Sequence, residues 1–397
     1  MTGRRPPIQG FGSARAAMDV MDDDALCLVL ERVDSHVSLI CAAAVCKRWR
    51  RAIADAAFLR RYRSLHAPAV AGEFHNGAWR SNEGPVFVPS SPSMVDARHL
   101  SLDFLPNDPG AWTVVDSRGS LLLLLLLLMD MRLLGNGFPD MVICEPLTRR
   151  FEIISPPAEH IKEGRSFLID VTANETGGGI SISNFRVLCM FHCGDGVMHT
   201  AMLTAGSSWS EKSICHAVPN FHSTKFLGRA GGSRYFCVEG TSLVILDGST
   251  GDFTSSVFPA IGVFDFDMER CNFFVTELRD GKPRIVTVSH CTLKVFARLG
   301  SGEWALEKSV LLWQSTRGLP GYNLLFFHYD QDILTRGTGS VILSPWSVVL
   351  CPQFAEKWRY SINLETMEAE RASCDMGLMV YRCDLPWPPV LHAHLDR

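Results

Sequence analysis

The sequence lacks an apolar stretch long enough to cross a membrane. The most apolar candidate, Leu121–Met129, is nine residues long, and Asp130 follows it directly. A spanning helix needs about 20 apolar residues. The turn-like residues 118–120 before the run favour a strand buried on both faces, with a helix as the alternative. The first eighteen residues also lack the apolar centre of a secretory signal, so we expect a disordered tail over 1–18.

A strong excess of one charge sign and paired cysteines are also missing. The formal net charge is −4, which gives no bias toward nucleic acid or acidic lipid. The thirteen cysteines are odd in number and have no paired spacing, which favours free thiols in a reducing compartment over a disulfide framework. We therefore expect a cytoplasmic or nuclear protein. Its 47% hydrophobic residues are typical of a folded core.

Recognisable catalytic motifs are absent as well. There is no Gly-x-Ser-x-Gly motif, and the Gly-rich stretches lack the Lys-Ser/Thr of a phosphate-binding loop. The best metal candidates are Cys189, His192, Cys193 and His199. On one strand the two cysteines would lie about 13 Å apart, so buried thiols and ordinary histidines are favoured over a zinc site. We expect no enzyme activity, no cofactor and no metal.

Residues 21–66 predict three short helices, because apolar residues recur there at steps of three and four and so share a face. Asp22 can cap the first helix and Asp55 the third. Ser35 or Ser38 can cap the second. The apolar stripes are Leu26, Leu30 and Val33 in the first helix, Leu39, Ala42, Cys46, Trp49 and Ile53 in the second, and Phe58, Tyr62 and Leu65 in the third.

So small a helical unit cannot bury all of its apolar side chains internally. Several of them lie off the three stripes and are expected to face outward. A surplus of this kind indicates either docking onto a partner or packing against the rest of the chain. The residues concerned are Leu28, Val29, Val37, Ile40 and Val45.

Two motifs in this region carry a family resemblance. The segment Val45–Arg50 reads VCKRWR, and Phe58–Tyr62 reads FLRRY. Together with the opening DDALCLVLERV, they resemble an F-box, the module by which substrate receptors join Skp–cullin–F-box ubiquitin ligases. The resemblance covers roughly 45 residues. The sequence departs from the family at Met21-Asp22, where Leu-Pro is common, although Asp can cap the helix in place of a proline start.

The resemblance implies a non-catalytic substrate-recognition subunit of such a ligase. Its helices would bind a Skp-family adaptor, and through it a cullin, while the rest of the chain would hold a target protein. Neither nucleic acid nor a membrane is expected as a partner. The implied docking and supporting residues, which the sequence does not separate, are Met21, Leu26, Leu30, Val33, Leu39, Val45, Cys46 and Trp49.

Two alternative functions remain open on the sequence. One is a small-molecule receptor or enzyme with its site at the centre of a β-propeller, because some propellers are enzymes. A convergent cluster of His, Asp or Glu side chains at that centre would favour it. The other is an interaction protein that no longer recruits a ligase, which the missing Leu-Pro allows.

The chain divides into an F-box helical domain over 19–66, a linker over 67–98 and a β domain over 99–397. The linker is predicted because residues 67–98 are rich in Pro, Ser, Ala and Gly. After residue 99, short runs of Val, Ile, Leu, Phe and Thr alternate with Gly-containing turns. This pattern predicts an all-β sandwich, barrel or propeller.

Internal repeats favour the propeller. One pattern, a strand, a short turn and a strand, occurs at Glu145, at Asp247 and more weakly at Asn363, with an offset of 102 residues between the first two. A second pattern, a Gly-Ser turn followed by Trp and Glu-Lys-Ser, occurs at Trp209 and Trp304. The patterns alternate at a mean spacing of about 54 residues, close to the period of kelch-type blades.

The predicted fold class is therefore multidomain, α plus all-β: a three-helix F-box followed by a kelch-like β-propeller of about six blades. The closing run Leu385–Pro389, which reads LPWPP, also resembles the C-terminal regions of plant F-box proteins. That resemblance implies a propeller-like β domain, because such regions are typically of that kind.

Overall fold

The computed structural model describes most of the chain in detail, and it is mostly β with few helices, as predicted. None of the described helices is long and apolar enough to cross a membrane. The predicted tail 1–18, Met21 and the closing run 386–389 lie outside the described part. The described residues are 22–66, 70–76, 84–90, 96–126, 138–169, 180–210, 213–216, 218, 224–238, 242–257, 273–278, 280–328, 330–336, 339–345, 358–372 and 380–385.

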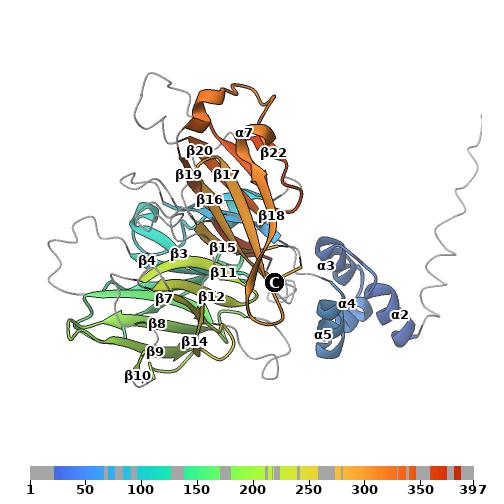
Figure 1. Cartoon of the computed structure of the whole chain (residues 1–397). Helices are drawn as coiled ribbons and strands as arrows, with labels where there is room; N and C mark the ends of the chain where they lie inside the picture. The colour runs from blue at the N-terminus through green and yellow to red at the C-terminus, as the bar shows by residue number, and fades with distance from the viewer. Residues whose placement is uncertain are drawn as a thin grey trace, which may run out of the picture. The chain divides into compact units, whose positions relative to one another are not determined.

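The chain forms two compact units. The first comprises Met1–Val70, Ala173–Gly179 and Leu385–Arg397, and its described part is helical. The second comprises Ala71–Thr172 and Ile180–Asp384, and it contains nearly all of the strands. Both appear in Figure 1, which labels the helices and most of the strands.

The described part of the helical unit, within 22–66, contains four short helices where three were predicted. They are α2 (Asp23–Leu30), α3 (His36–Val45), α4 (Lys47–Ala54) and α5 (Ala56–Leu65). The predicted middle helix is divided at Cys46, whose backbone is extended with φ −157° and ψ 166°. The Cys46 side chain accepts a hydrogen bond from the Trp49 amide at 3.5 Å and so caps α4, which is why a second helix begins there.

The predicted caps of the other helices are confirmed. The Asp22 carboxylate accepts from the Ala25 amide at 2.7 Å, and the Ser35 hydroxyl accepts from the Ser38 amide at 3.3 Å. Asp55 accepts from the amides at the start of α5. Each cap satisfies backbone donors that the first helical turn leaves unpaired. The core that the four helices enclose consists of Leu26, Leu30, Leu39, Ala43, Ile53, Phe58 and Tyr62.

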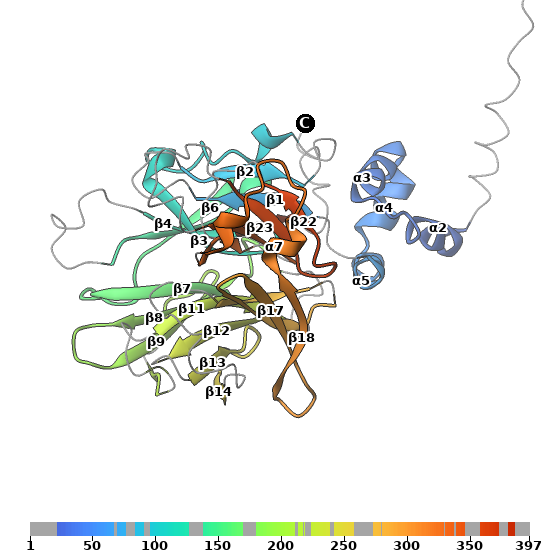
Figure 2. The same ribbon diagram turned by 45° about the horizontal axis from the view of Figure 1, so that its top comes forward.

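Antiparallel meanders of four strands make up most of the second unit, and in each one strands that are consecutive in sequence lie side by side (Figure 2). The first contains β3 (Trp112–Arg118), β4 (Leu121–Leu126), β5 (Met141–Glu145) and β6 (Arg150–Ile154). The second contains β7 (Glu163–Ile169), β8 (Arg186–His192), β9 (Met198–Thr204) and β10 (Ser213–Ile214).

Two further meanders share one eight-stranded sheet, in which Gly228 of β11 and Val275 of β15 form a parallel pair. One contains β11 (Thr224–Ala230), β12 (Ser233–Val238), β13 (Ser242–Leu246) and β14 (Phe253–Val257). The other contains β15 (Phe273–Glu277), β16 (Pro283–Ser289), β17 (Thr292–Arg298) and β18 (Trp304–Leu311). The fifth meander contains β19 (Gln331–Arg336), β20 (Ser340–Pro345), β21 (Tyr360–Asn363) and β22 (Ala369–Arg371).

A three-stranded sheet joins the two ends of the β unit. Its order is β2 (Val86–Pro89), β1 (Val70–His75), β23 (Val380–Asp384). The predicted linker 67–98 is therefore corrected, because two strands of this sheet lie within it. Ala71 and Phe74 of β1 are buried, and this burial holds the segment in place despite its Pro- and Gly-rich composition. Short helical segments of this unit are η1 (Ala97–Leu100), η2 (Pro109–Ala111), η3 (Pro146–Thr148), α7 (Leu312–Ser315) and η4 (Leu324–His328).

The repeats found in the sequence all fall at one structural position. Each copy lies where the third strand of a meander connects to the fourth, so the predicted strand–turn–strand pattern is confirmed. The markers Glu145, Trp209, Asp247, Trp304 and Asn363 belong to the five meanders in chain order.

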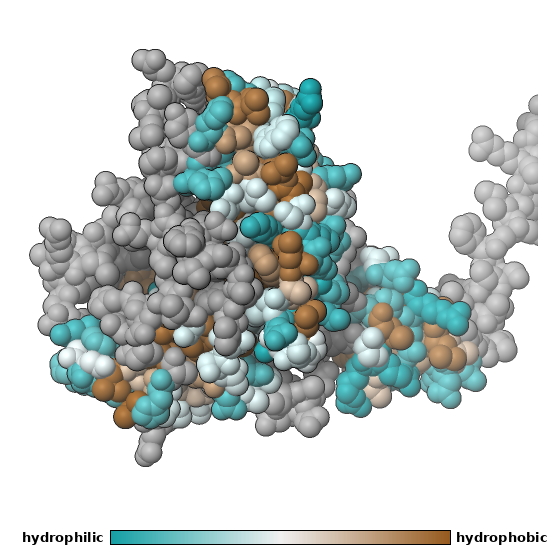
Figure 3. All heavy atoms as spheres, in the orientation of Figure 1, coloured by the Kyte–Doolittle hydropathy of each residue, from teal (hydrophilic) through white to brown (hydrophobic). Residues whose placement is uncertain are grey.

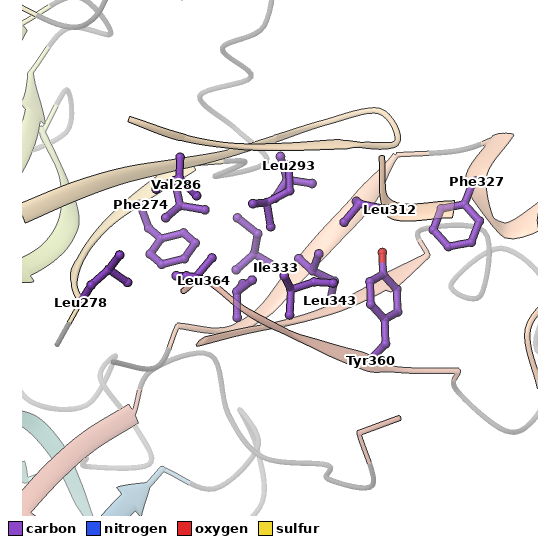
Figure 4. Packing of buried hydrophobic residues seen from close by; sticks show 14 of the residues in the cluster. Phe274, Leu278, Val286, Leu293, Leu312, Phe327, Ile333, Leu343, Tyr360 and Leu364 are labelled. Atoms are coloured by element: carbon purple, nitrogen blue, oxygen red, sulfur yellow. The ribbon is translucent and has the colours of Figure 1, made fainter. Parts of the chain in front are cut away.

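The described part of the leucine run, Leu121–Leu126, is a strand, as predicted. Leu121, Leu122, Leu123 and Leu124 of β4 are fully buried, so both faces of the strand lie in the protein interior. The largest apolar cluster among the described residues lies between β15–β17 and β19–β21. Figure 4 shows side chains of the two groups of strands pointing toward one another there.

Candidate functional site

The described surface of the helical unit carries exposed apolar side chains. Leu28 and Val29 of α2 are 62% and 52% exposed, and Val45 at the end of α3 is 64% exposed. Figure 3 shows hydrophobic atoms, in brown, among hydrophilic ones on the visible face of this unit. Three of the five residues predicted to face outward do so, and the side chains of the other two, Val37 and Ile40, lie outside the described set.

The structure separates the implied docking residues by burial. Three of them, Leu26, Leu30 and Leu39, are fully buried in the helical core and hold the helices together. Val33 and Trp49 are half-buried against that core. The exposed ones are Val45 and Cys46. Of the implied docking residues that the structure describes, Val45 and Cys46 are therefore the exposed ones, and Leu28 and Val29 of α2 are exposed as well.

Polar contacts fix the helices that present these residues. Arg48 of α4 donates to Asp23 of α2 at 2.8 Å. Arg50 donates from Nε to the Ala43 carbonyl of α3 at 3.2 Å. Through these bonds α4 holds both the helix that carries Leu28 and the helix that ends at Val45.

A second candidate site lies in the β unit, around a buried carboxylate. Asp116 follows a β-bulge in β3, at a register shift between Val114 and Asp116. Its Oδ1 accepts from the Ser117 amide at 2.9 Å, and its Oδ2 accepts from the Leu168 amide of β7 at 2.8 Å. Two backbone donors from neighbouring sheets thus orient the carboxylate.

Two guanidinium groups share this carboxylate. Arg229 of β11 donates to Oδ1 at 3.0 Å, and Arg234 of β12 donates to Oδ2 at 2.6 Å. Burial alone would raise the pKa of Asp116, but the charges of Arg234 and Arg229 and the hydrogen bonds outweigh it and hold the pKa below its usual value. The carboxylate therefore stays ionised and joins β3, β7, β11 and β12.

Further titratable groups surround the triad of Asp116, Arg229 and Arg234. Tyr381 of β23 has its pKa raised, mainly by burial and also by the charge of Asp116. The pKa of Asp384, at the end of β23, is also raised by burial, while Arg382 opposes the rise with a hydrogen bond at 2.8 Å. Charged groups from three sheets therefore meet near the C-terminal ends of the first strands of the meanders.

Sequence reasoning missed this cluster. There are two local signals: an Asp in the middle of strand β3, and a pair of arginines on either side of the Gly231-Gly232 hairpin turn. Neither signal identifies its partner. More than 110 residues separate Asp116 from both arginines, so only the folded chain brings them together.

The predicted metal candidates are not brought together as ligands. Cys189 of β8 is fully buried, and burial raises its pKa to about 12. His199 pairs instead with Asp195 at 2.7 Å. His192 is cross-strand neighbour to Met198, so it lies on the opposite face of the sheet from His199. Among the described residues, no three His, Cys, Asp or Glu side chains are grouped closely enough to hold a metal ion.

Comparisons with known proteins give only distant structural likenesses. No family model matches the sequence, and no curated protein matches it. A luciferin-regenerating enzyme is 10% identical, over 68% of this chain and 80% of that one, with a TM-score of 0.34. The β-propeller domain of Cps50 (Swd1) from Myceliophteria thermophila is 9% identical, over 68% and 75%, with a TM-score of 0.35. Virginiamycin B lyase from Staphylococcus aureus is 12% identical, over 68% and 87%, with a TM-score of 0.31.

These likenesses overturn one prediction. The sequence led us to expect a chain without enzyme activity, yet several of the similar structures are of enzymes, which also include a post-proline cleaving enzyme and a putative 6-phosphogluconolactonase. The prediction that the chain is not an enzyme is therefore wrong. TM-scores of this size assign no activity to the chain, so the functional argument rests on its own residues.

Proposed function

We propose that the chain is a substrate-recognition subunit of a Skp–cullin–F-box ubiquitin ligase. The helical unit binds a Skp-family adaptor, and the β unit holds a target protein. The observation that carries the proposal is the position of the VCKRWR segment at the junction of α3 and α4, where Val45 and Cys46 are exposed on a frame fixed by Arg48 and Arg50. Tethering a target beside a conjugating enzyme raises its effective concentration there.

In this proposal the β unit is a propeller of six blades. Five blades are the four-stranded meanders, and the sixth is the three-stranded sheet that unites β23 with β1 and β2. Contacts between end strands of different sheets support this: β23 lies beside β3, β3 beside β7, and β11 beside β15. Because β23 pairs with β1, the sheet that contains both would close such a ring and leave no open edge between its two ends.

The test is co-purification with a Skp-family adaptor. We expect the wild-type chain to retain the adaptor, and Leu28→Asp combined with Val45→Asp to lose it, because the two charges fall on exposed apolar positions of the proposed interface. Leu30→Asp is unsuitable for this purpose, because Leu30 is a core residue and the variant would unfold the unit. Circular dichroism checks that the double variant keeps its helices.

The matched control is Leu306→Asp, which places the same charge on a 56%-exposed leucine of β18. It should bind the adaptor as the wild type does. If the wild type binds no adaptor, the ligase role is excluded, which leaves an interaction protein without ligase recruitment or the second candidate function described below. If Leu28→Asp with Val45→Asp binds normally, the assigned face is wrong.

A second candidate function is a small-molecule receptor or an enzyme centred on the β unit. A specific observation favours it, namely the triad of Asp116, Arg229 and Arg234 with Asp384 nearby. A cluster of buried titratable side chains with shifted pKa values is a signal of a functional site and supports this alternative. Saturable binding of a small molecule, lost on substitution in this cluster, tests it.

A further inference from the structure

β6 is the outer strand of the first meander (Figure 2), and none of the described strands pairs with its free edge. An outer strand leaves a row of backbone N–H and C=O groups without partners in the sheet, so it can accept a further strand. Large apolar side chains are exposed beside these groups, because Phe151 is 41% and Ile153 is 54% exposed. The four successive exposed residues of the strand are Arg150, Phe151, Glu152 and Ile153.

The outer strands of the other meanders are less suited to such pairing. β10 has two residues and β22 has three. A bulge interrupts β18 where it pairs with Val295 and Phe296, and bulges protect a sheet edge. The residues of β14 whose exposure is described include no exposed large apolar side chain. β6, in contrast, keeps an unbroken register with β5 over all of its five residues.

The charges of β6 indicate which strand it can accept. Arg150 and Glu152 lie on the same face, because side chains two residues apart in a strand share a face. Neither has an ion-pair partner among the described residues. Two charges of the same sign would repel a second copy of this strand, whereas one positive and one negative charge can match it. The strand is therefore complementary to itself in charge.

Self-pairing in the antiparallel direction selects one register. If a twofold axis passes through Phe151, Arg150 of each copy lies opposite Glu152 of the other, and two ion pairs form. The two Phe151 side chains then meet on the other face of the sheet. An axis through Arg150 or through Glu152 would instead place two like charges directly opposite each other, which is destabilising.

Neighbouring side chains already hold Phe151 at this edge. The ring centres of Phe151 and Phe104 lie 6.2 Å apart. Arg149 lies over the Phe104 ring at 5.2 Å and donates to Asp103 at 2.8 Å. A ring that is fixed before association loses less side-chain entropy when it is covered, so these contacts favour binding.

We propose that two copies of this chain form a symmetric dimer by antiparallel pairing of their β6 strands about a twofold axis at Phe151. The same surface of both copies takes part, as in most protein homodimers. The pairing satisfies the free backbone groups of both edges and covers Phe151 and Ile153. So short an edge forms a small interface, and the dimer is therefore weak and depends on concentration. This inference goes beyond both candidate functions and depends on neither.

The experiment is sedimentation equilibrium of the full-length chain at micromolar to submillimolar concentrations. We expect a monomer–dimer equilibrium for the wild type. Arg150→Glu and Glu152→Arg, each measured alone, should raise the dissociation constant by about tenfold or more, because each change turns both ion pairs into like-charge pairs. The matched control is Glu370→Arg, at an exposed glutamate of the outer strand β22, and it should dimerise as the wild type does.

Mixing the two single variants tests the geometry. Arg150→Glu carries two acidic residues on β6 and Glu152→Arg carries two basic ones, so the mixture should form a heterodimer that is tighter than either homodimer. The double variant, with both changes in one chain, should dimerise as the wild type does. Such rescue also shows that the single variants are folded. The proposal is overturned by a wild type that stays monomeric, by a dimer that neither single change weakens, or by a mixture that associates no more tightly than its components.

Discussion

Asp116 and Arg234 are 118 residues apart in the chain, yet Oδ2 of one and Nη2 of the other lie 2.6 Å apart. The pair links the first meander to the third. The Leu168 amide of the second meander donates to the same carboxylate oxygen. Three successive sheets therefore contact one carboxylate. Its removal should lower the stability of the whole β unit.

Asp116→Asn should destabilise the β unit by about 3–5 kcal/mol, because it leaves two buried guanidinium groups without their shared anion. Urea unfolding followed by tryptophan fluorescence measures the change. Asp103→Asn is the matched control, since it breaks the exposed pair of Asp103 with Arg149 at 2.8 Å and should cost less than about 1 kcal/mol. Equal losses of unfolding free energy in the two variants would show that Asp116 does not stabilise the contacts between the sheets.

His36 should make the stability of the helical unit depend on pH. Its ring is buried edge-on against Tyr62 at 5.7 Å, and burial, together with the charge of His66, lowers its pKa. The unfolded chain therefore binds a proton first, near pH 6.5, so stability is complete above about pH 6.5 and falls as the pH drops toward the native pKa. Urea unfolding followed by far-ultraviolet circular dichroism measures this slope.

In His36→Phe the slope should flatten, because the group that titrates has been removed. His160→Phe, at an exposed position of the β unit, is the control and should keep the wild-type slope. A slope that is unchanged in His36→Phe would assign the pH dependence to another group.

Gly251→Ala should destabilise the β unit by roughly 1–2 kcal/mol, because Gly251 has φ +82°, in the left-handed region that a Cβ disfavours. The added Cβ would also lie 3.1 Å from Cε of Met202. Gly300→Ala is the control: its φ is not in that region, no atom lies within 4 Å of its added Cβ, and its stability should be unchanged. Thermal unfolding of the two variants compares them, and equal melting temperatures would contradict the argument.

Thiol reactivity should follow burial. Cys41 and Cys46 are exposed and should be alkylated first by iodoacetamide. Cys189 and Cys144 should react only on unfolding, because both are buried and burial raises the pKa of each, to about 12 for Cys189. Peptide mapping after brief labelling, with and without urea, distinguishes the sites. Labelling of Cys189 in the native protein at the rate of Cys46 would contradict the burial assigned here.

Local features of the fold could be predicted from the sequence because they depend on neighbouring residues. The hairpins at Asp247 and Asn363 begin with side chains that accept from amides two and three residues on. Glu145 begins the equivalent hairpin with a longer side chain, which bonds Ser120 and Thr148 instead. The residue four positions after each of these three has a positive φ, so the turn geometry is kept where the side-chain bonding is not.

Other features could not be predicted because their partners are distant in the chain. β1 and β2 resemble a linker in composition, and β1 pairs with β23, roughly 300 residues later. The division of the middle helix depends on one extended residue, Cys46, within a sequence whose apolar spacing continues through it. The charged residues around Asp116 come from separate sheets, so no spacing in the sequence predicts that they lie together.

The pairing of β23 with β1 also determines when the β unit can complete its folding during synthesis on the ribosome. β1 and β2 emerge early, and β1 must wait with one edge unpaired until Val380–Asp384 has been synthesised. A nascent chain that stalls before Val380 would expose that edge together with the apolar residues of β1. Chaperone capture should therefore be strongest just before Val380–Asp384 becomes available, and a stop codon shortly before Val380 should leave a chain that cannot complete this sheet.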